Sequence, residues 1–366
     1  MSTLKQQRAL SSAYMHWAKT QSQAPFNLAA SGVQAYPLER LRVSLSDLEL
    51  TGESGYGYPP LQEAIAAKCG VTSDAVVAAN GTSMANFLAL AALVAPGDEV
   101  LLEQPTYELI LSAALYLGAE VKRFARPFAT GFALDPTEVA RAITPRTRLV
   151  VVTNLHNPSN AYAGDEVLRE IGRIAARVGA LVLVDEVYLD AAFERAPQTA
   201  YHLGEHFITT SSLTKIYGLS GLRCGWILAA PPLAERMWRL NDLFGVMQPH
   251  ATERLSCIAF ERLPEIAAHT RALLERNRAL ANNFLATRGD LAAFPFTDGM
   301  ITFPRLLTGD VDAFCALLRE KYETSVVPGR FFEMPEHFRL SISGDTEMLK
   351  GGLERLGAAL DEFKRR

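Results

Sequence analysis

The sequence predicts an α/β fold, in which a large doubly wound domain with a mostly parallel sheet is joined to a smaller α+β domain. Short β-branched runs alternate with longer amphipathic runs through the first two thirds of the chain, as in sheets covered by helices on both faces. From about residue 250 the pattern becomes largely helical. A chain of 366 residues is long enough for two domains. We expect a large domain at 45–245 and a small domain at 1–44 plus 246–366.

The clearest evidence for a parallel sheet is a predicted strand–helix–strand unit in the middle of the chain. The uninterrupted apolar runs 149–154 and 180–186 are typical of strands buried on both faces. Between them, residues 165–179 carry apolar side chains at helical spacing. Such a unit joins two parallel strands. Upstream, the same reasoning predicts a helix over 84–94 and a strand over 99–103.

The later elements complete the two predicted domains. Residues 252–288 are mostly helical, with Pro264 marking a break or kink. The remaining predicted elements are strands at 206–211, 225–229 and 339–343 and helices near 311–321 and 345–364.

Composition argues against several classes of protein. A net charge of −4 and a pI near 6.0 give no support for binding to nucleic acid or to an anionic membrane. The four cysteines form no CxxC pair, so we expect neither a metal site nor a disulfide framework, and a cytoplasmic setting fits best. The N-terminus has no signal-peptide pattern, and no apolar run approaches the length of a membrane span.

Several polar residues follow the predicted strands at the edge where ligands bind in open α/β sheets. Asn157 follows the strand at 149–154, Asp185 and Tyr188 follow the apolar residues LVLV (181–184) of the next, and Lys215 follows the strand at 206–211. Taken alone, each has an ordinary explanation as a turn or cap residue. Together they place an amide, an acid, a phenol and a lysine on adjoining strand ends.

A phosphate site is predicted beside this group. Gly81, Thr82 and Ser83 form a glycine-containing turn that enters a helix, where free backbone N–H groups and the helix dipole favour an anion. Ser212 and Arg223 supply further donors. A phosphate cradle, a lysine amine and a buried carboxylate are the three groups that pyridoxal 5′-phosphate requires.

Lys215 itself stands out by its scarcity. The chain has eight lysines, and Lys215 is the only one between Lys122 and Lys321.

Three motifs carry a family resemblance. The stretch SLTKIYGLSGLRCGW is similar to S-x-x-K-x-x-G-x-x-G-x-R-x-G, HNPSN resembles HNPTG, and VDEVY resembles D-E-x-Y. Their order and spacing also match. The chain therefore resembles fold-type-I pyridoxal-phosphate enzymes of the class I/II aminotransferase family, from about Leu28 to the last helix.

The resemblance implies roles around the cofactor ring. Lys215 is expected to form the Schiff base and then to move a proton between the substrate α-carbon and the cofactor. Asp185 is expected to pair with the pyridinium nitrogen. Asn157 and Tyr188 are expected to hydrogen-bond the ring oxygen, and Tyr107 to stack on the ring, although ordinary packing explains Tyr107 equally well.

The resemblance also implies contacts to the phosphate and the substrate. Ser212 and Arg223 are expected to bind the phosphate together with the backbone of Gly81, Thr82 and Ser83. Arg339 is expected to grip the substrate α-carboxylate, to which Asn157 and Gly32 contribute. The alternatives are a surface arginine at 339 and a simple turn glycine at 32.

Two positions depart from the family pattern. Asn160 replaces the glycine of HNPTG. Gly52 aligns with a tyrosine that in the family often reaches the phosphate across a dimer interface, while Tyr56 and Tyr58 lie nearby.

The resemblance implies an aminotransferase that moves an amino group between an L-amino acid and a 2-oxo acid, working as a homodimer. A pyridoxal-phosphate-dependent β-lyase, decarboxylase or biosynthetic cyclase or oxidase remains an alternative. Ser212 and Lys215 also spell the S-x-x-K of acyl-serine hydrolases, but the chain lacks the accompanying K-T-G. A non-catalytic regulator with the same fold is expected to have lost Lys215 or Asp185.

Overall fold

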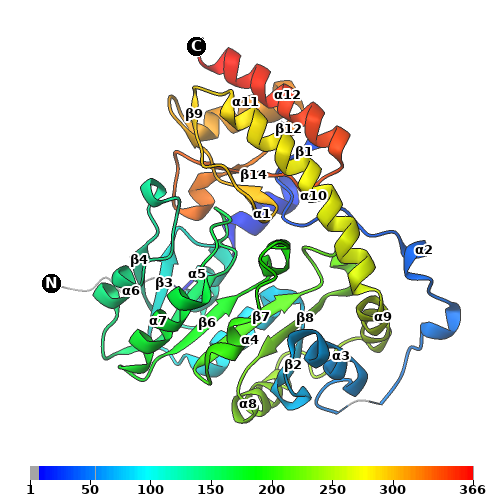
Figure 1. The fold of residues 1–366 in the computed structure, drawn as a ribbon. Coiled ribbons are helices and arrows are strands. Elements are labelled where there is room, and N and C mark those ends of the chain that lie inside the picture. Colours follow the sequence, from blue (N-terminus) through cyan, green and yellow to red (C-terminus); the bar gives the residue numbers. More distant parts are fainter. Residues whose placement is uncertain (1–7, 54, 366) are drawn as a thin grey trace.

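The computed structural model describes residues 8–53 and 55–365, and its centre is a seven-stranded sheet (Figure 1). Strand β8 is antiparallel to both of its neighbours, and the other neighbouring pairs are parallel. The mostly parallel α/β sheet that the sequence predicts is therefore confirmed. In spatial order the strands are β2 (Val76–Asn80), β8 (Cys224–Leu228), β7 (Phe207–Ser212), β6 (Leu181–Asp185), β5 (Thr147–Thr153), β3 (Glu99–Gln104) and β4 (Glu120–Ala125).

Helices cover both faces of this sheet, which explains its apolar strands. In β5, Leu149 and Val151 pack into one core cluster, whereas Val150 and Val152 pack into another on the opposite face. The first cluster includes residues of α4 (Gly81–Leu93), α5 (Glu108–Tyr116) and α8 (Pro231–Asn241). The second includes residues of α6 (Pro136–Ala142) and α7 (Asp165–Ala176). Near β2, helix α3 (Pro59–Cys69) packs against α9 (His250–Glu261).

A second group of elements lies on top of the sheet and contains α1 (Ala13–Thr20) and β1 (Phe26–Asn27) from the early part of the chain as well as the C-terminal helix (Figure 1). Strand β1 pairs in parallel with β12 (Thr324–Ser325), so the first segment is built into the last part of the fold. A three-stranded sheet has the order β10 (Ile301–Thr302), β14 (Phe338–Ser341), β13 (Val327–Pro328). The other elements are α10 (Leu263–Ala286), β9 (Leu291–Ala292), β11 (Arg305–Leu306), α11 (Val311–Tyr322) and α12 (Thr346–Phe363).

The expected break near Pro264 is present. Helix α9 ends at Glu261, and Pro264 occupies the first turn of α10, where its missing N–H costs no hydrogen bond. Amphipathic α12 buries one face against α10 and α11. Within residues 8–53 and 55–365, no helix is both long enough and apolar enough to cross a membrane.

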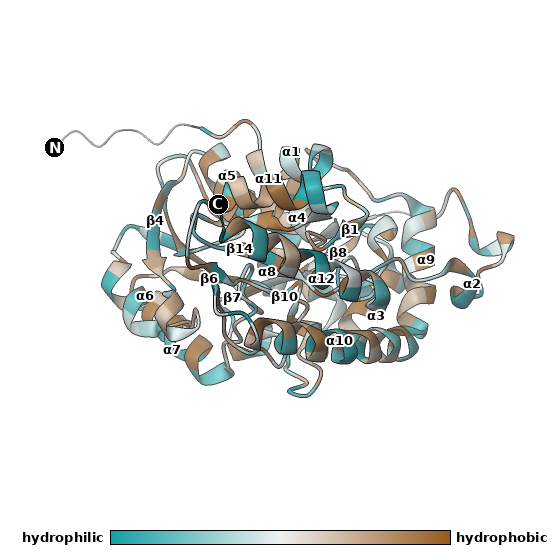
Figure 2. Ribbon diagram, turned by 90° about the horizontal axis from the view of Figure 1, so that it is seen from above, coloured by the Kyte–Doolittle hydropathy of each residue, from teal (hydrophilic) through white to brown (hydrophobic). Residues whose placement is uncertain are grey.

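The segment around α2 (Leu38–Leu41) projects from the body of the molecule in two perpendicular views, with a hydrophobic tip in the second (Figures 1 and 2).

Candidate active site

The carboxyl ends of β5, β6 and β7 meet in one pocket, which contains seven of the residues that the sequence predicts for the site. Asp185 is the last residue of β6, and Lys215 lies three residues beyond the end of β7. Parallel strands bring these distant segments to the same edge of the sheet. The seven predicted residues that line the pocket are Thr82, Ser83, Tyr107, Asn157, Asp185, Tyr188 and Lys215.

Asp185 is buried, and its carboxylate is held by two hydrogen bonds. Oδ2 accepts from Nδ2 of Asn86 at 2.7 Å, and Oδ1 accepts from the backbone N–H of Val187 at 3.0 Å. Thr210 in turn donates to Oδ1 of Asn86 at 2.6 Å, which fixes the orientation of that amide. Burial raises the pKa of Asp185 to about 6, while the hydrogen bond from Asn86 opposes the rise by stabilising the ionised form.

Lys215 faces this acid from the loop after β7. Its Nζ donates to Oγ of Ser31 at 2.8 Å. Desolvation in the pocket lowers the pKa of Lys215 to about 8, and the positive charges of Arg339 and Arg223 act in the same direction. Part of the amine is therefore neutral near physiological pH and available as a nucleophile.

Tyr188 and Asn157 are fixed from outside their own loops. The Tyr188 hydroxyl donates to the carbonyl of Ser31 at 3.0 Å. The backbone N–H of Asn157 donates to Oγ1 of Thr153 at 3.0 Å, and that hydroxyl donates to the buried carboxylate of Glu103 at 2.7 Å. Buried polar groups with such partners hold one orientation.

An anion cradle lies where α4 begins. Gly81 has a φ of +76°, which favours glycine, and a Cβ on it would meet the terminal guanidinium of Arg223. Ser212 Oγ accepts from the Thr82 hydroxyl at 2.8 Å. The Arg223 guanidinium donates to backbone carbonyls, including that of Asn80 at 3.3 Å, and has no carboxylate partner in the described part of the chain. Such a cradle suits a phosphate.

Arg339 is fully buried, so the surface alternative for it is wrong. Its guanidinium donates to Oδ1 of Asn157 and to the hydroxyl of Tyr14, each at 3.0 Å. Its Nε has no hydrogen-bond partner, and no carboxylate of residues 8–53 or 55–365 pairs with it. A buried cation without an anionic partner points to an anionic ligand.

Gly32 lies beside the lysine. A Cβ at Gly32 would lie 3.4 Å from the Cα of Lys215, and the next N–H, that of Val33, donates to the Lys215 carbonyl at 2.8 Å. The glycine allows the two segments to approach closely.

The two departures from the family motif have different structural settings. Asn160 has a φ of +70°, a left-handed conformation that asparagine tolerates better than most residues, and its amide donates to the carbonyl of Asp298. Asparagine thus replaces glycine without requiring another backbone path. Gly52 lies against His250, whose ring occupies the space a side chain at 52 would need.

Several residues of the site were not predicted from the sequence. Ser31, Asn86 and Thr153 line the pocket, and Tyr14 reaches Arg339 from α1. One signal was available for Asn86, because it lies four residues after Thr82 and therefore on the same face of α4.

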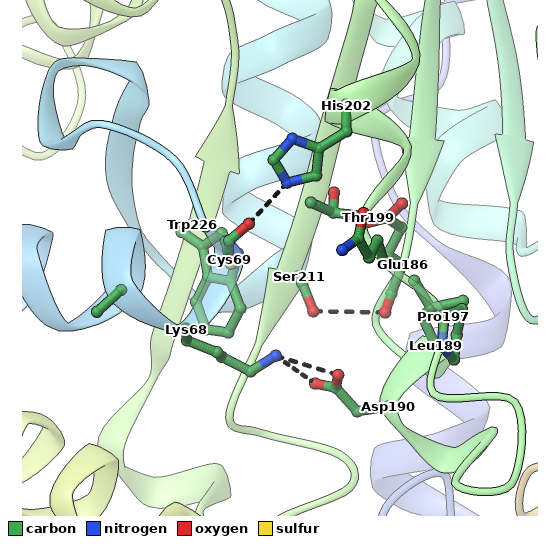
Figure 3. A pocket seen from close by; sticks show the side chains of 13 residues that line it. Lys68, Cys69, Glu186, Leu189, Asp190, Pro197, Thr199, His202, Ser211 and Trp226 are labelled. Atoms are coloured by element: carbon green, nitrogen blue, oxygen red, sulfur yellow. Dashed lines mark hydrogen bonds and ion pairs between the residues drawn. The ribbon is translucent and has the colours of Figure 1, made fainter.

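A larger cavity of about 490 Å³ lies on the other face of the sheet, and Figure 3 shows it. Its wall contains Glu186 and Ser211, which are adjacent in sequence to Asp185 and Ser212. Successive side chains of a strand point to opposite faces of the sheet, so these two face away from the pocket around Lys215. Lys68 is already paired, since its Nζ lies 3.1 Å from the Asp190 carboxylate. Glu186 accepts from the N–H of Ala200 at 2.7 Å, and burial raises its pKa to about 8. We therefore place the chemistry in the pocket around Lys215.

The pocket around Lys215 fits pyridoxal 5′-phosphate. A reactive amine suits its aldehyde, a buried carboxylate suits its ring nitrogen, and the cradle at Gly81 and Arg223 suits its phosphate.

Comparison with known proteins agrees with this geometry. The family model for aminotransferase class I and II matches residues 34–356. A probable N-succinyldiaminopimelate aminotransferase of Mycobacterium tuberculosis is 31% identical over 88% of this chain and 81% of its own length. Capreomycidine synthase of Streptomyces vinaceus is 29% identical over 94% and 92%. A crystal structure of a PLP-dependent aminotransferase from Streptococcus suis superposes with a TM-score of 0.89 at 25% identity, covering 95% of this chain and 96% of that one.

The match spans most of the chain, and the pocket offers each group that the cofactor needs. The chain therefore belongs to the aminotransferase class I and II family and is a pyridoxal-phosphate-dependent transferase.

Proposed function

We propose that the protein moves an amino group between an L-amino acid and a 2-oxo acid, with the reaction centred on Lys215. The observation that carries this proposal is that Lys215 and Asp185 line one pocket together with Thr82 and Ser83 of the anion cradle. Relatives named as aminotransferases support the type of reaction.

Pyridoxal phosphate, when bound, supplies an aldehyde that reacts with amines and a ring that stores the electrons of a broken bond. Asp185 would hold its ring nitrogen, Asn157 and Tyr188 its ring oxygen, and Tyr107 one face of the ring. The phosphate would lie among Ser212, Arg223 and the N-terminal residues of α4, Gly81, Thr82 and Ser83. Its negative charge would balance an Arg223 guanidinium that lacks a carboxylate partner in the described residues.

Arg339 and Lys215 would act on the substrate. The buried Arg339 guanidinium would receive the α-carboxylate, with Asn157 and the backbone at Gly32 beside it. Lys215, with a pKa lowered to about 8, would take a proton from the substrate α-carbon and return it to the cofactor carbon that had carried the aldehyde.

Lys215→Ala tests the proposal, with Lys68→Ala as a matched control. We expect the wild type and Lys68→Ala to show the visible absorbance of the lysine-bound cofactor, because Lys68 pairs with Asp190 in the other cavity. We expect Lys215→Ala to lose that absorbance and all transfer of amino groups. A Lys215→Ala variant that keeps the absorbance would refute the role of this lysine.

A second candidate is a synthase-type reaction on an amino acid. The relative that matches 94% of the chain is named capreomycidine synthase, which favours keeping this alternative. The two reactions differ in their need for an acceptor. Screening a panel of amino acids with and without a 2-oxo acid separates them, since only aminotransfer stops when the 2-oxo acid is omitted.

We also propose that two copies of the chain form a homodimer. Six exposed residues, here called the apolar surface, lie on two neighbouring segments: Leu45, Leu50, Leu243, Phe244, Val246 and Met247. The segments contact each other, since the Tyr56 hydroxyl donates to Asp242 at 3.4 Å and His250 lies 3.6 Å from Glu49. An apolar surface of this kind on a globular protein marks an interaction site.

A further inference from the structure

Ser31 is held rigidly beside the lysine that the sequence motifs identify. The segment that contains it runs alongside the Lys215 loop, with the N–H of Val33 donating to the Lys215 carbonyl at 2.8 Å and the N–H of Tyr36 donating to the Gly218 carbonyl at 3.0 Å. These two backbone hydrogen bonds, both just C-terminal to Ser31, fix the position of Ser31 relative to Lys215. Ser31 arrives from the start of the chain, 184 residues before the lysine.

Both polar groups of Ser31 contact residues of the site. Its Oγ accepts from Nζ of Lys215 at 2.8 Å, and its carbonyl accepts from the Tyr188 hydroxyl at 3.0 Å. Among the residues the structure describes, Ser31 is the hydrogen-bond partner of the Lys215 amine. The Asp185 oxygens already accept from Asn86 and Val187.

We propose that Ser31 is a positioning residue for Lys215. The Ser31 hydroxyl holds the free Lys215 amine in place and stabilises its protonated form. This inference rests on the proposed function of Lys215. It concerns the states in which the lysine is not attached to the cofactor, namely before the cofactor binds and while a substrate amine has replaced the lysine.

The charges around the amine explain why this hydroxyl matters. Arg339 on β14 and Arg223 before β8 repel a proton on Lys215, and Asp185 on β6 attracts it. The phenols of Tyr107 and Tyr188 line the same pocket and are neutral, since burial raises the pKa of each above its usual value. An oxygen acceptor binds an ammonium more strongly than a neutral amine. Removing the Ser31 hydroxyl should therefore lower the pKa of the lysine.

The test follows how fast pyridoxal phosphate attaches to the cofactor-free protein, measured by visible absorbance between pH 6 and pH 10. Attachment needs the neutral amine, so the rate rises with pH and reaches a plateau. For Ser31→Ala we expect the midpoint about one pH unit lower, equivalent to ~1.4 kcal/mol, because an ionic hydrogen bond is stronger than a neutral one. We also expect a severalfold lower plateau, because the amine is no longer oriented.

Two further variants separate positioning from loss of structure. Ser31→Thr keeps the hydroxyl and should keep the wild-type midpoint. Ser31→Cys provides a weaker acceptor and should lie between the wild type and Ser31→Ala. If Ser31→Ala does not fold, the comparison of Ser31→Thr with Ser31→Cys still decides. Faster attachment below the midpoint is a gain that a damaged fold would not produce.

The inference is overturned if Ser31→Ala keeps the wild-type midpoint, or if Ser31→Thr shifts as far as Ser31→Ala. Lys215→Ala is measured in the same assay. If Lys215→Ala still develops the absorbance, the proposed function itself fails; if only the Ser31 shift is absent, the function stands and this inference falls.

Discussion

Asn86 shows how one amide sets the charge of the acid opposite the lysine. It donates to Asp185 from a buried position on α4, and it is itself oriented by Thr210. The pKa of the Asp185 carboxyl is raised by burial and lowered by its hydrogen bonds, and the net result is a pKa of about 6. The amide therefore favours the ionised form that a cationic ring nitrogen needs.

For Asn86→Ala we expect the pKa of Asp185 to rise above about 6 by roughly one unit, because one charged hydrogen bond worth ~1.4 kcal/mol is lost. Fewer carboxylates are then ionised at pH 6.5, so cofactor affinity at that pH should fall about threefold. At pH 8.5 the carboxylate is ionised with or without the amide, so the deficit should shrink. Titration with pyridoxal phosphate at the two pH values measures this. Asn282→Ala removes an amide that bonds a backbone carbonyl outside the pocket and should leave affinity unchanged. An equal deficit at both pH values would contradict the explanation.

Site residues that lie within one short sequence motif can be predicted from the sequence alone. Lys215, Ser212 and Arg223 fall in a single stretch, so their spacing alone predicts that they lie together. Ser31 and Tyr14 belong to no such stretch, and only the tertiary fold brings them to Lys215 and Arg339. Their roles and those of the predicted residues stay predictions until the variants are measured.

Among the elements, the first turn of α4 is the part most directly built for an anion. It begins with Gly81 at positive φ, and Arg223 crosses the space where a side chain would stand. Register places Asn80 opposite Cys224, so the residue before β8 necessarily lies over the start of the helix. Sheet pairing thus positions the cradle.

Gly81→Ala and Gly97→Ala form a matched pair of glycine substitutions at positive φ. Both should lose about 1 kcal/mol of unfolding free energy through backbone strain. Only Gly81→Ala should also weaken cofactor binding, at least tenfold, because its methyl displaces Arg223, whereas nothing lies within 4 Å of a Cβ at Gly97. Urea unfolding and cofactor titration measure the two effects separately. Equal cofactor affinity in the two variants would rule out the cradle.

The elements that the sequence did not predict have physical reasons for being missed. Strand β4 is an edge strand with the sequence EVKRFA, and its exposed charges hide the apolar run that marks the inner strands. The inner strands β5 and β6 were predicted because both faces are buried. Domain limits at 45–245 stay a prediction. The pairing of β1 with β12 joins two segments that both lie outside those limits.

At the scale of the whole molecule, we predict that the apolar surface is buried between two copies of the chain. Leu243 is 78% exposed, and a charge there would be buried in a dimer. We expect Leu243→Asp to shift the wild-type dimer towards monomer in sedimentation equilibrium. Leu307→Asp, at an exposed leucine outside the apolar surface, should leave the dimer intact. A monomeric wild type would contradict the proposed homodimer.

The pairing of β1 with β12 also orders events during synthesis on the ribosome. Phe26 and Asn27 are made well before their partner strand, Thr324–Ser325. Strand β1 must therefore wait for its partner strand while about 300 intervening residues emerge, whereas the segment around Val33 can already pair with the Lys215 loop. A nascent chain can thus complete the central sheet long before it acquires Arg339, and premature termination there would leave a sheet without the buried guanidinium that we propose receives the α-carboxylate.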